Sequence, residues 1–143
     1  MMIIKSPYEI NETLGRLLKV LVEHDMTIFS IIDHSGGAAQ VGLSMPDTKL
    51  IIFGNPKVGT DLMLADPNFS IELPLKIVLR KNNDDTEVLY QTVTELAMRY
   101  NGTKLNDSNR NIDKVIENMI EKGVVKLLGV GDVFGVWWSI FAF

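Results

Sequence analysis

Apolar residues recur at helical spacing in two stretches of the chain. Spacings of three and four positions place one apolar stripe along a helix, and in the first stretch this stripe is Ile10, Leu14, Leu17, Leu18 and Leu21. Ser6-Pro-Tyr-Glu9 precedes it with a capping serine, a proline for the first helical position and a capping box. We therefore expect a helix that starts there and ends at His24-Asp25. The second stretch, Ile112 to Ile120, predicts a helix that ends at Gly123.

Five segments rich in β-branched and aromatic residues predict strands. Thr27–Asp33 is apolar on nearly both faces, so we expect it at the centre of a sheet. Leu75–Lys81 and Thr86–Gln91 flank a polar run and predict a hairpin. Met2–Lys5 and Thr48–Phe53 complete the set.

Three further helices are expected to be short. Ser35–Leu43 and Asp61–Asp66 follow two of the strands, and Thr92-Val-Thr-Glu95 is a capping box that opens a helix to about Tyr100. A mixed order of strands and helices, with a hairpin in the second half, favours an α+β fold over a doubly wound parallel sheet. We predict an antiparallel-rich sheet with helices packed mainly on one face.

Length and composition indicate one globular domain. A chain of 143 residues, 46% hydrophobic and 22% charged, is long enough to bury a core of its own. We assign that domain to residues 1–123. A net charge of −4 and a pI near 5.1 argue against nucleic acid, because a phosphate backbone needs a basic face.

The absence of cysteine also narrows the chemistry. It removes disulfides, thiolate zinc sites and cysteine nucleophiles, and it suits a reducing compartment. The first apolar run ends at Lys5 and is too short for the core of a signal peptide. The expected localisation is cytoplasmic.

The segment Gly54–Thr60 is predicted to be a loop between a buried strand and a helix. Such a junction points backbone N–H groups and the positive end of the helix at an anion. Gly54 and Gly59 have the separation of a phosphate-binding loop, but Thr60 follows directly where that motif has lysine, and Lys57 lies inside the loop. Because the lysine of that motif is missing at this position, we exclude the function of a nucleotide triphosphatase. Contact with a small anion and a purely structural turn both remain open.

These two segments carry a resemblance to a known family. Residues 32–43 read I-D-H-S-G-G-A-A-Q-V-G-L and residues 50–60 read L-I-I-F-G-N-P-K-V-G-T, followed by Met63 and Asp66-Pro67. Together with Leu73–Lys76 and Tyr90, they resemble the bacterial domain-of-unknown-function family number 302. Gln91-Thr-Val93 departs from the N-D-P that the family tends to have there.

The resemblance covers roughly residues 6–100. It implies an α+β fold like that of the TATA-box-binding protein, often as a homodimer. It implies no particular reaction, because a fold does not determine a function, and it identifies no cofactor.

Asp33 and His34 stand where a strand ends, a common place for a site. An imidazole near a carboxylate can transfer protons, although neighbouring strand residues point to opposite faces. The alternative is that Asp33 caps the next helix. Tyr90 would join them if its strand lies nearby, and otherwise belongs to the core. His24 and His34 lie a strand apart, so no metal site is predicted.

Residues 124–143 form an apolar extension with both tryptophans of the chain. Charges and glycines interrupt it, and the uncharged run from Val133 to Phe143 is too short to cross a membrane as a helix. Exposed aromatics drive association, so we expect the extension to pack on the domain or on a dimer partner, in preference to peripheral membrane contact.

Three functions fit these features. The first is a homodimeric module that binds a small, anionic ligand; the second is an enzyme that uses His34 as acid or base; the third is an interaction protein that uses the apolar extension. The expected ligand-binding residues are Asp33, His34, Gly54, Asn55, Lys57, Gly59, Thr60 and Tyr90.

Overall fold

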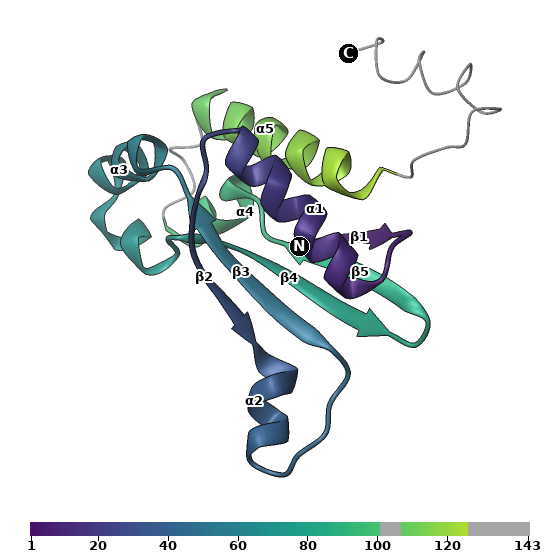
Figure 1. Cartoon of the computed structure of the whole chain (residues 1–143). Helices are drawn as coiled ribbons and strands as arrows, with labels where there is room; N and C mark the ends of the chain where they lie inside the picture. Colours follow the sequence, from purple (N-terminus) through teal and green to yellow (C-terminus); the bar gives the residue numbers. More distant parts are fainter. Residues whose placement is uncertain (101–106, 126–143) are drawn as a thin grey trace, which may run out of the picture.

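A single antiparallel sheet organises the chain. The computed structural model describes residues 1–100 and 107–125, and the strand order in this part is β1-β5-β4-β3-β2 (Figure 1). The strands are β1 (Met2–Ser6), β2 (Thr27–Asp33), β3 (Thr48–Gly54), β4 (Leu75–Asn82) and β5 (Asp85–Tyr90). The helices are α1 (Ile10–Glu23), α2 (His34–Gln40), α3 (Pro56–Ala65), the 3-10 helix η1 (Pro67–Ile71), α4 (Val93–Ala97) and α5 (Asp107–Val124).

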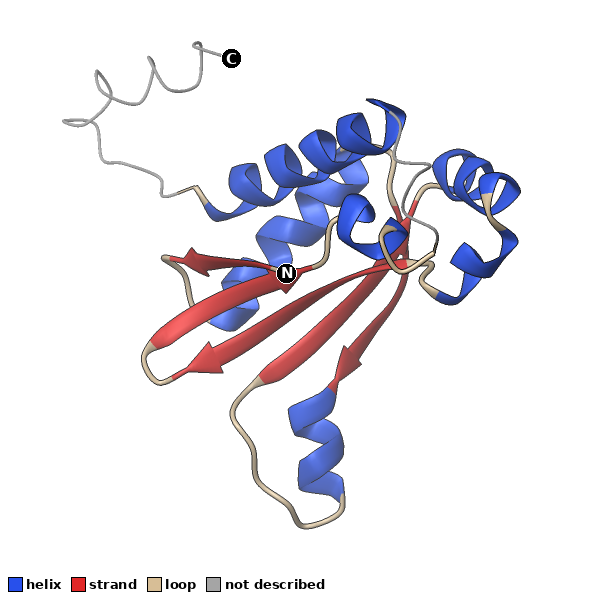
Figure 2. Ribbon diagram, turned by 180° about the vertical axis from the view of Figure 1, so that it is seen from behind, coloured by secondary structure: helices blue, strands red, loops and turns tan. Residues whose placement is uncertain are grey.

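The core lies between one face of the sheet and the pair α1 and α5, as Figures 1 and 2 show from opposite sides. Alternate residues of the strands point into it, because side chains along a strand alternate between faces. Its fully buried members include Ile51, Phe53, Ile77, Leu79 and Val88 from the strands. The α+β, TATA-box-binding-protein-like fold expected from the sequence, with helices on one face, is confirmed.

The predicted central position of Thr27–Asp33 is wrong, because β2 is an edge strand. Its only partner in the described part of the chain is β3, and most of its residues are exposed. Burial on both faces of the sheet therefore does not explain why β2 is apolar on both faces. Ile28 packs against the core, whereas Phe29, Ile31 and Ile32 remain 53%, 44% and 37% exposed.

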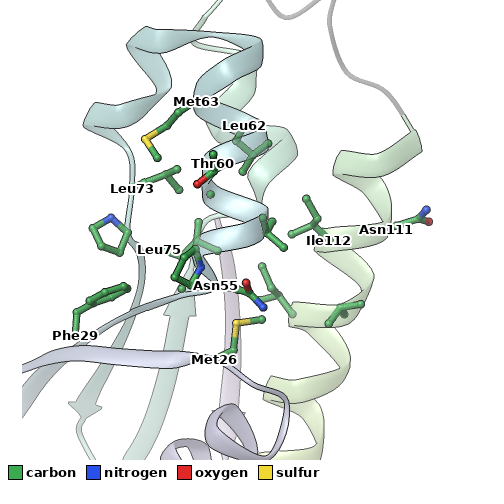
Figure 3. A pocket seen from close by; sticks show the side chains of 17 residues that line it. Met26, Phe29, Asn55, Thr60, Leu62, Met63, Leu73, Leu75, Asn111 and Ile112 are labelled. Atoms are coloured by element: carbon green, nitrogen blue, oxygen red, sulfur yellow. The ribbon is translucent and has the colours of Figure 1, made fainter.

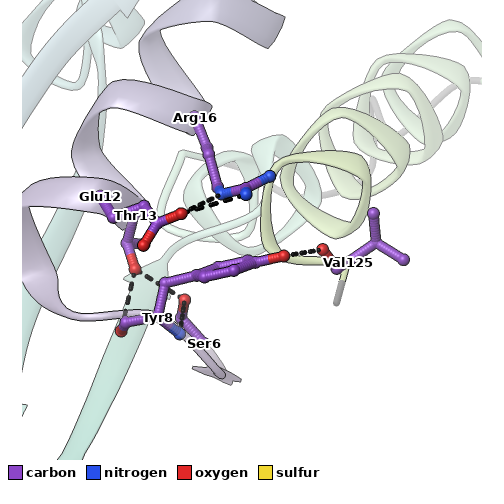
Figure 4. Close-up of polar contacts among 6 residues, drawn as sticks. All are labelled: Ser6, Tyr8, Glu12, Thr13, Arg16 and Val125. Atoms are coloured by element: carbon purple, nitrogen blue, oxygen red, sulfur yellow. Dashed lines mark hydrogen bonds and ion pairs between the residues drawn. The ribbon is translucent and has the colours of Figure 1, made fainter. Parts of the chain in front are cut away.

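The start of α1 also differs from the prediction. Ser6 remains in β1, paired with Thr86, and the helix begins at Ile10 after an N-cap at Glu9 that makes no side-chain capping bond. The Ser6 hydroxyl instead lies 2.6 Å from that of Thr13, inside the core. Tyr8 fastens this corner to the end of α5, because its hydroxyl donates to the Val125 carbonyl at 2.8 Å (Figure 4).

The opposite face of the sheet carries an ionic pair between the partly exposed Arg80 and the buried Glu87, and this pair should make stability depend on pH. Glu87 accepts hydrogen bonds from Asn82 and Arg80, and these bonds hold the pKa of its carboxyl below the ordinary value of 4.5. A lowered folded-state pKa contributes stability above the unfolded value and loses it as the pH falls through the folded one.

We therefore expect the Glu87→Gln variant to lose less stability than the parent chain between neutral pH and about pH 3. Urea denaturation at both pH values measures this difference. Equal losses in the two proteins would show that Glu87 carries no pH-dependent stabilisation.

Candidate functional site

A cavity of about 550 Å³ lies at the end of the sheet where β3 runs into α3. Helix α3, the first residues of β2 and β4, and one side of α5 form its walls (Figure 3). Its apolar walls include Met26, Phe29, Leu62, Leu73 and Ile116. Four residues of the predicted site contribute to the lining: Gly54, Asn55, Gly59 and Thr60.

The Gly54–Thr60 segment is not the loop that the sequence predicted. Asn55 is the N-cap of α3, and its side chain accepts a hydrogen bond from the Lys57 N–H at 3.0 Å. Pro56 fills the first helical position, and the Gly59 N–H bonds to the Asn55 carbonyl at 2.9 Å. The amides of Lys57 and Gly59 are therefore already paired within the protein.

Polar groups are few in the lining of the cavity. Among the described residues that line it, only Asn55, Thr60 and Asn111 bring polar side chains, and none is charged. Asn111 points away from α3 in Figure 3, whereas Asn55 lies between α3 and α5. Because the Asn55 oxygen accepts from Lys57, its amide nitrogen remains as a donor with no partner among the described residues. Lys57 itself does not line the cavity.

Asp33 and His34 lie at the far end of β2. Thr27 pairs with Gly54, whereas Asp33 pairs with Lys49. Asp33 therefore lies four residues beyond Phe29, the last residue of β2 that lines the cavity, or about 13 Å along the strand. The expectation that they share one hollow with the Gly54–Thr60 segment is wrong for a single copy, because antiparallel pairing puts the end of β2 beside the start of β3.

Asp33 does cap α2, the alternative that the sequence left open. Its carboxylate accepts from the Gly36 N–H at 2.9 Å and the Ser35 hydroxyl at 2.8 Å. These two bonds lower the pKa of Asp33. His34 is exposed as the first residue of α2, and Asp33 is engaged in the cap, so within the described part of the chain no hydrogen bond joins the His34 imidazole to a carboxylate.

Tyr90 belongs to the core and does not line the cavity. It is 4% exposed, and its hydroxyl has no hydrogen-bond partner among the described residues. Burial, and then the negative charges of Glu117, Glu121, Asp113 and Glu95, raise its pKa to about 12.

Two predictions remain, one about a metal site and one about the C-terminal extension. Among residues 1–100 and 107–125, no group of three His, Cys, Asp or Glu side chains could hold a metal ion. The apolar extension predicted from residue 124 lies outside the described residues from 126 onward, while Val124 itself ends α5 and is buried.

Sequence reasoning missed the apolar walls of the cavity. Ile112, Val115 and Ile116 of α5 formed part of a predicted core stripe, and nothing in the spacing showed that Val115 is 47% exposed at a cavity. A signal was present elsewhere, because the segments that carry the family resemblance also contain Met63, Leu73, Pro74 and Leu75, which line it.

Comparison with known proteins supports the fold and extends little further. Residues 2–122 match the family described as domain of unknown function DUF302. The crystal structure of an uncharacterized conserved protein DUF302 from Bacillus stearothermophilus superposes with a TM-score of 0.79 at 18% identity, covering 85% of this chain and 95% of that one.

Two further similarities are to proteins named as channels. The fluoride-specific ion channel FluC 1 of Brucella suis is 37% identical over 73 residues, which are 51% of this chain and 29% of the channel. FluC 1 of Brucella abortus has the same identity over 73 residues and 27% of its length. The chain thus spans less than a third of either protein. No helix in its described part is long and apolar enough to cross a membrane.

Proposed function

This chain belongs to the family described as domain of unknown function DUF302, and we propose that it is a small-ligand binding module whose site is the cavity beside α3. The observation that carries the proposal is the cavity itself. Its volume of about 550 Å³ falls within the range of roughly 300–1,000 Å³ that ligand pockets occupy. An apolar lining with a few polar groups is also typical of such pockets.

The lining supports an apolar ligand in place of the anion expected from the sequence. Enclosing a charge in a cavity without a charged partner is costly, and no charged side chain from residues 1–100 or 107–125 lines this one. A molecule with an apolar body and one hydrogen-bond acceptor would match the Asn55 amide donor. Thr60 adds a hydroxyl on the same helix.

Val115→Trp should block this site. Val115 lines the cavity and is 47% exposed, so the larger ring can enter the mouth without disturbing the core. With the neutral apolar fluorophore N-phenyl-1-naphthylamine as the probe, we expect a fluorescence titration to show binding to the parent chain. Affinity should fall roughly tenfold or more in the variant, a loss of about 1.4 kcal/mol.

Val22→Trp is the matched control, because Val22 is 61% exposed on α1 and does not line the cavity. It should bind the probe like the parent chain. Equal affinity in both tryptophan variants would contradict the assignment of the site. Titration with phosphate and with fluoride should leave the melting temperature unchanged; a rise would support an anion site instead, since binding to the folded state raises stability.

We also propose that the module is a homodimer that pairs through β2. The outer edge of β2 has no strand beside it in the described part of the chain. An exposed apolar edge is a template for pairing with another chain, and closed two-fold dimers are the commonest assembly of identical chains. Phe29, Ile31 and Ile32 would then be covered by the same residues of the second copy.

A further inference from the structure

The edge of β2 lacks the residue types that most often prevent pairing. Its sequence, TIFSIID, contains no lysine and no proline, the residues that commonly protect an edge strand. Its one charge is Asp33, which is engaged as the N-cap of α2. A register irregularity between Ile28 and Ser30 affects the side that pairs with β3.

Beyond the end of β2, the chain projects away from the sheet as an arm of residues 34–46, which we call the α2 arm (Figure 1). Helix α2 has no buried residue. After the helix, Val41, Leu43 and Met45 are 72%, 65% and 42% exposed. The described residues of one copy cover these apolar side chains only in part. The Asp33 cap and the Ser35 hydroxyl hold the start of the arm in place.

Two-fold pairing through β2 would bring the α2 arm to the cavity of the other copy. Related by a two-fold axis, two identical edge strands in one sheet run antiparallel. The Asp33 end of one β2 then lies beside the Thr27 end of the other, and Thr27 pairs with Gly54 at the start of the cavity wall. The separation along the strand that exists within one copy is thereby removed between copies.

We propose that the ligand site is composite: the α2 arm of a second copy closes the cavity beside α3. This inference rests on the proposed function and on the proposed dimer. Phe29 both lines the cavity and is exposed at the β2 edge, so the cavity is incomplete on the side where the arm arrives. Leu43 and Met45 extend the apolar lining, and the second copy's His34 supplies an imidazole at the mouth. The ligand is a mostly apolar molecule with hydrogen-bonding groups that meet Asn55 inside and His34 outside.

Engineered cysteines test the arrangement directly, because the natural chain has none. Ser30, at the middle of β2, His34 and Lys57 are all exposed. Ser30→Cys alone should form covalent dimers with a short bis-maleimide. A mixture of His34→Cys and Lys57→Cys chains should also cross-link, whereas either variant alone should not, because two copies of the same position lie at opposite ends of the paired strands.

The outcomes separate the parts of the proposal. Cross-linking by Ser30→Cys without any in the His34→Cys and Lys57→Cys mixture would overturn the composite site and leave the dimer standing. A single-chain mass by light scattering, with no cross-link at Ser30, would overturn both, while binding of N-phenyl-1-naphthylamine sensitive to Val115→Trp would still support the cavity as a site.

Leu43→Ser tests whether the arm closes the cavity or only lies nearby. If Leu43 covers the ligand, the variant should bind N-phenyl-1-naphthylamine about tenfold more weakly and keep the mass of a dimer. Val22→Ser, on an exposed surface of α1, is the matched control and should change nothing. Unchanged affinity in Leu43→Ser, in a protein that remains dimeric, would overturn the closure of the cavity by the arm.

Discussion

Replacing Leu17 with Ala is expected to lower the free energy of unfolding by about 2–5 kcal/mol. Leu17 is 1% exposed at the middle of α1 and packs where α1 meets α5. The two helices approach closely there, as Gly123 of α5 shows: a Cβ added at this glycine would lie only 2.6 Å from Leu17 Cδ2. Truncation removes apolar contacts from both helices and leaves a cavity that two packed helices cannot fully close. Urea denaturation measures this loss of stability, with the same dependence of the free energy of unfolding on urea concentration used for both proteins.

Leu64→Ala is the matched control for this prediction. Leu64 is 78% exposed on α3, and leucine and alanine both favour helices, so the substitution should change stability by less than about 0.5 kcal/mol. A similar loss in the two variants would mean that the α1–α5 contact does not organise the core. The two variants together therefore test how much the packing of α1 on α5 contributes to the stability of the fold.

The parts of the fold predicted best are those that local sequence determines. The hairpin of β4 and β5 follows from two strand-forming runs around a short polar turn. The capping box at Thr92 and Glu95 forms as predicted, with hydrogen bonds in both directions. In each case the interacting residues lie within a few positions of one another, so no knowledge of distant segments is needed.

Strand order, by contrast, could not be obtained from local pattern. The apolar residues of β2 indicated burial on both faces. A pattern of apolar residues does not show, however, whether the residues that bury a strand belong to the same chain or to another one. Ser6 shows a second limit. Its capping potential for α1 competes with pairing to Thr86 in β5, and that partner is 80 positions away in the sequence.

The candidate site was found in part for the same reason. Asn55 and Pro56 carry a standard helix-start signal, but Gly54 and Gly59 favour a loop over the same residues, and the sequence leaves open whether this segment contacts a ligand. The grouping with Asp33 and His34 came from the rule that sites gather at strand ends. That rule holds where parallel strands end together, whereas β2 and β3 run in opposite directions.

Replacing Tyr90 with Phe is expected to raise the free energy of unfolding by about 1 kcal/mol, an unusual sign for a core substitution. The Tyr90 hydroxyl is buried with no partner among the described residues, and folding therefore removes it from water without compensation. Phenylalanine keeps the ring and its packing and removes only the unsatisfied group.

Tyr100→Phe should have the opposite effect. The Tyr100 hydroxyl donates to a Glu72 carboxylate oxygen at 2.8 Å, and Arg99 donates to the same carboxylate. Loss of a hydrogen bond to a charged group should lower the free energy of unfolding. Thermal or urea denaturation of the two variants and the parent chain measures the sign of the change in the free energy of unfolding for each substitution. A loss of stability in Tyr90→Phe equal to that in Tyr100→Phe would mean that the Tyr90 hydroxyl is satisfied in solution and that its side of the core is not as dry as its burial indicates.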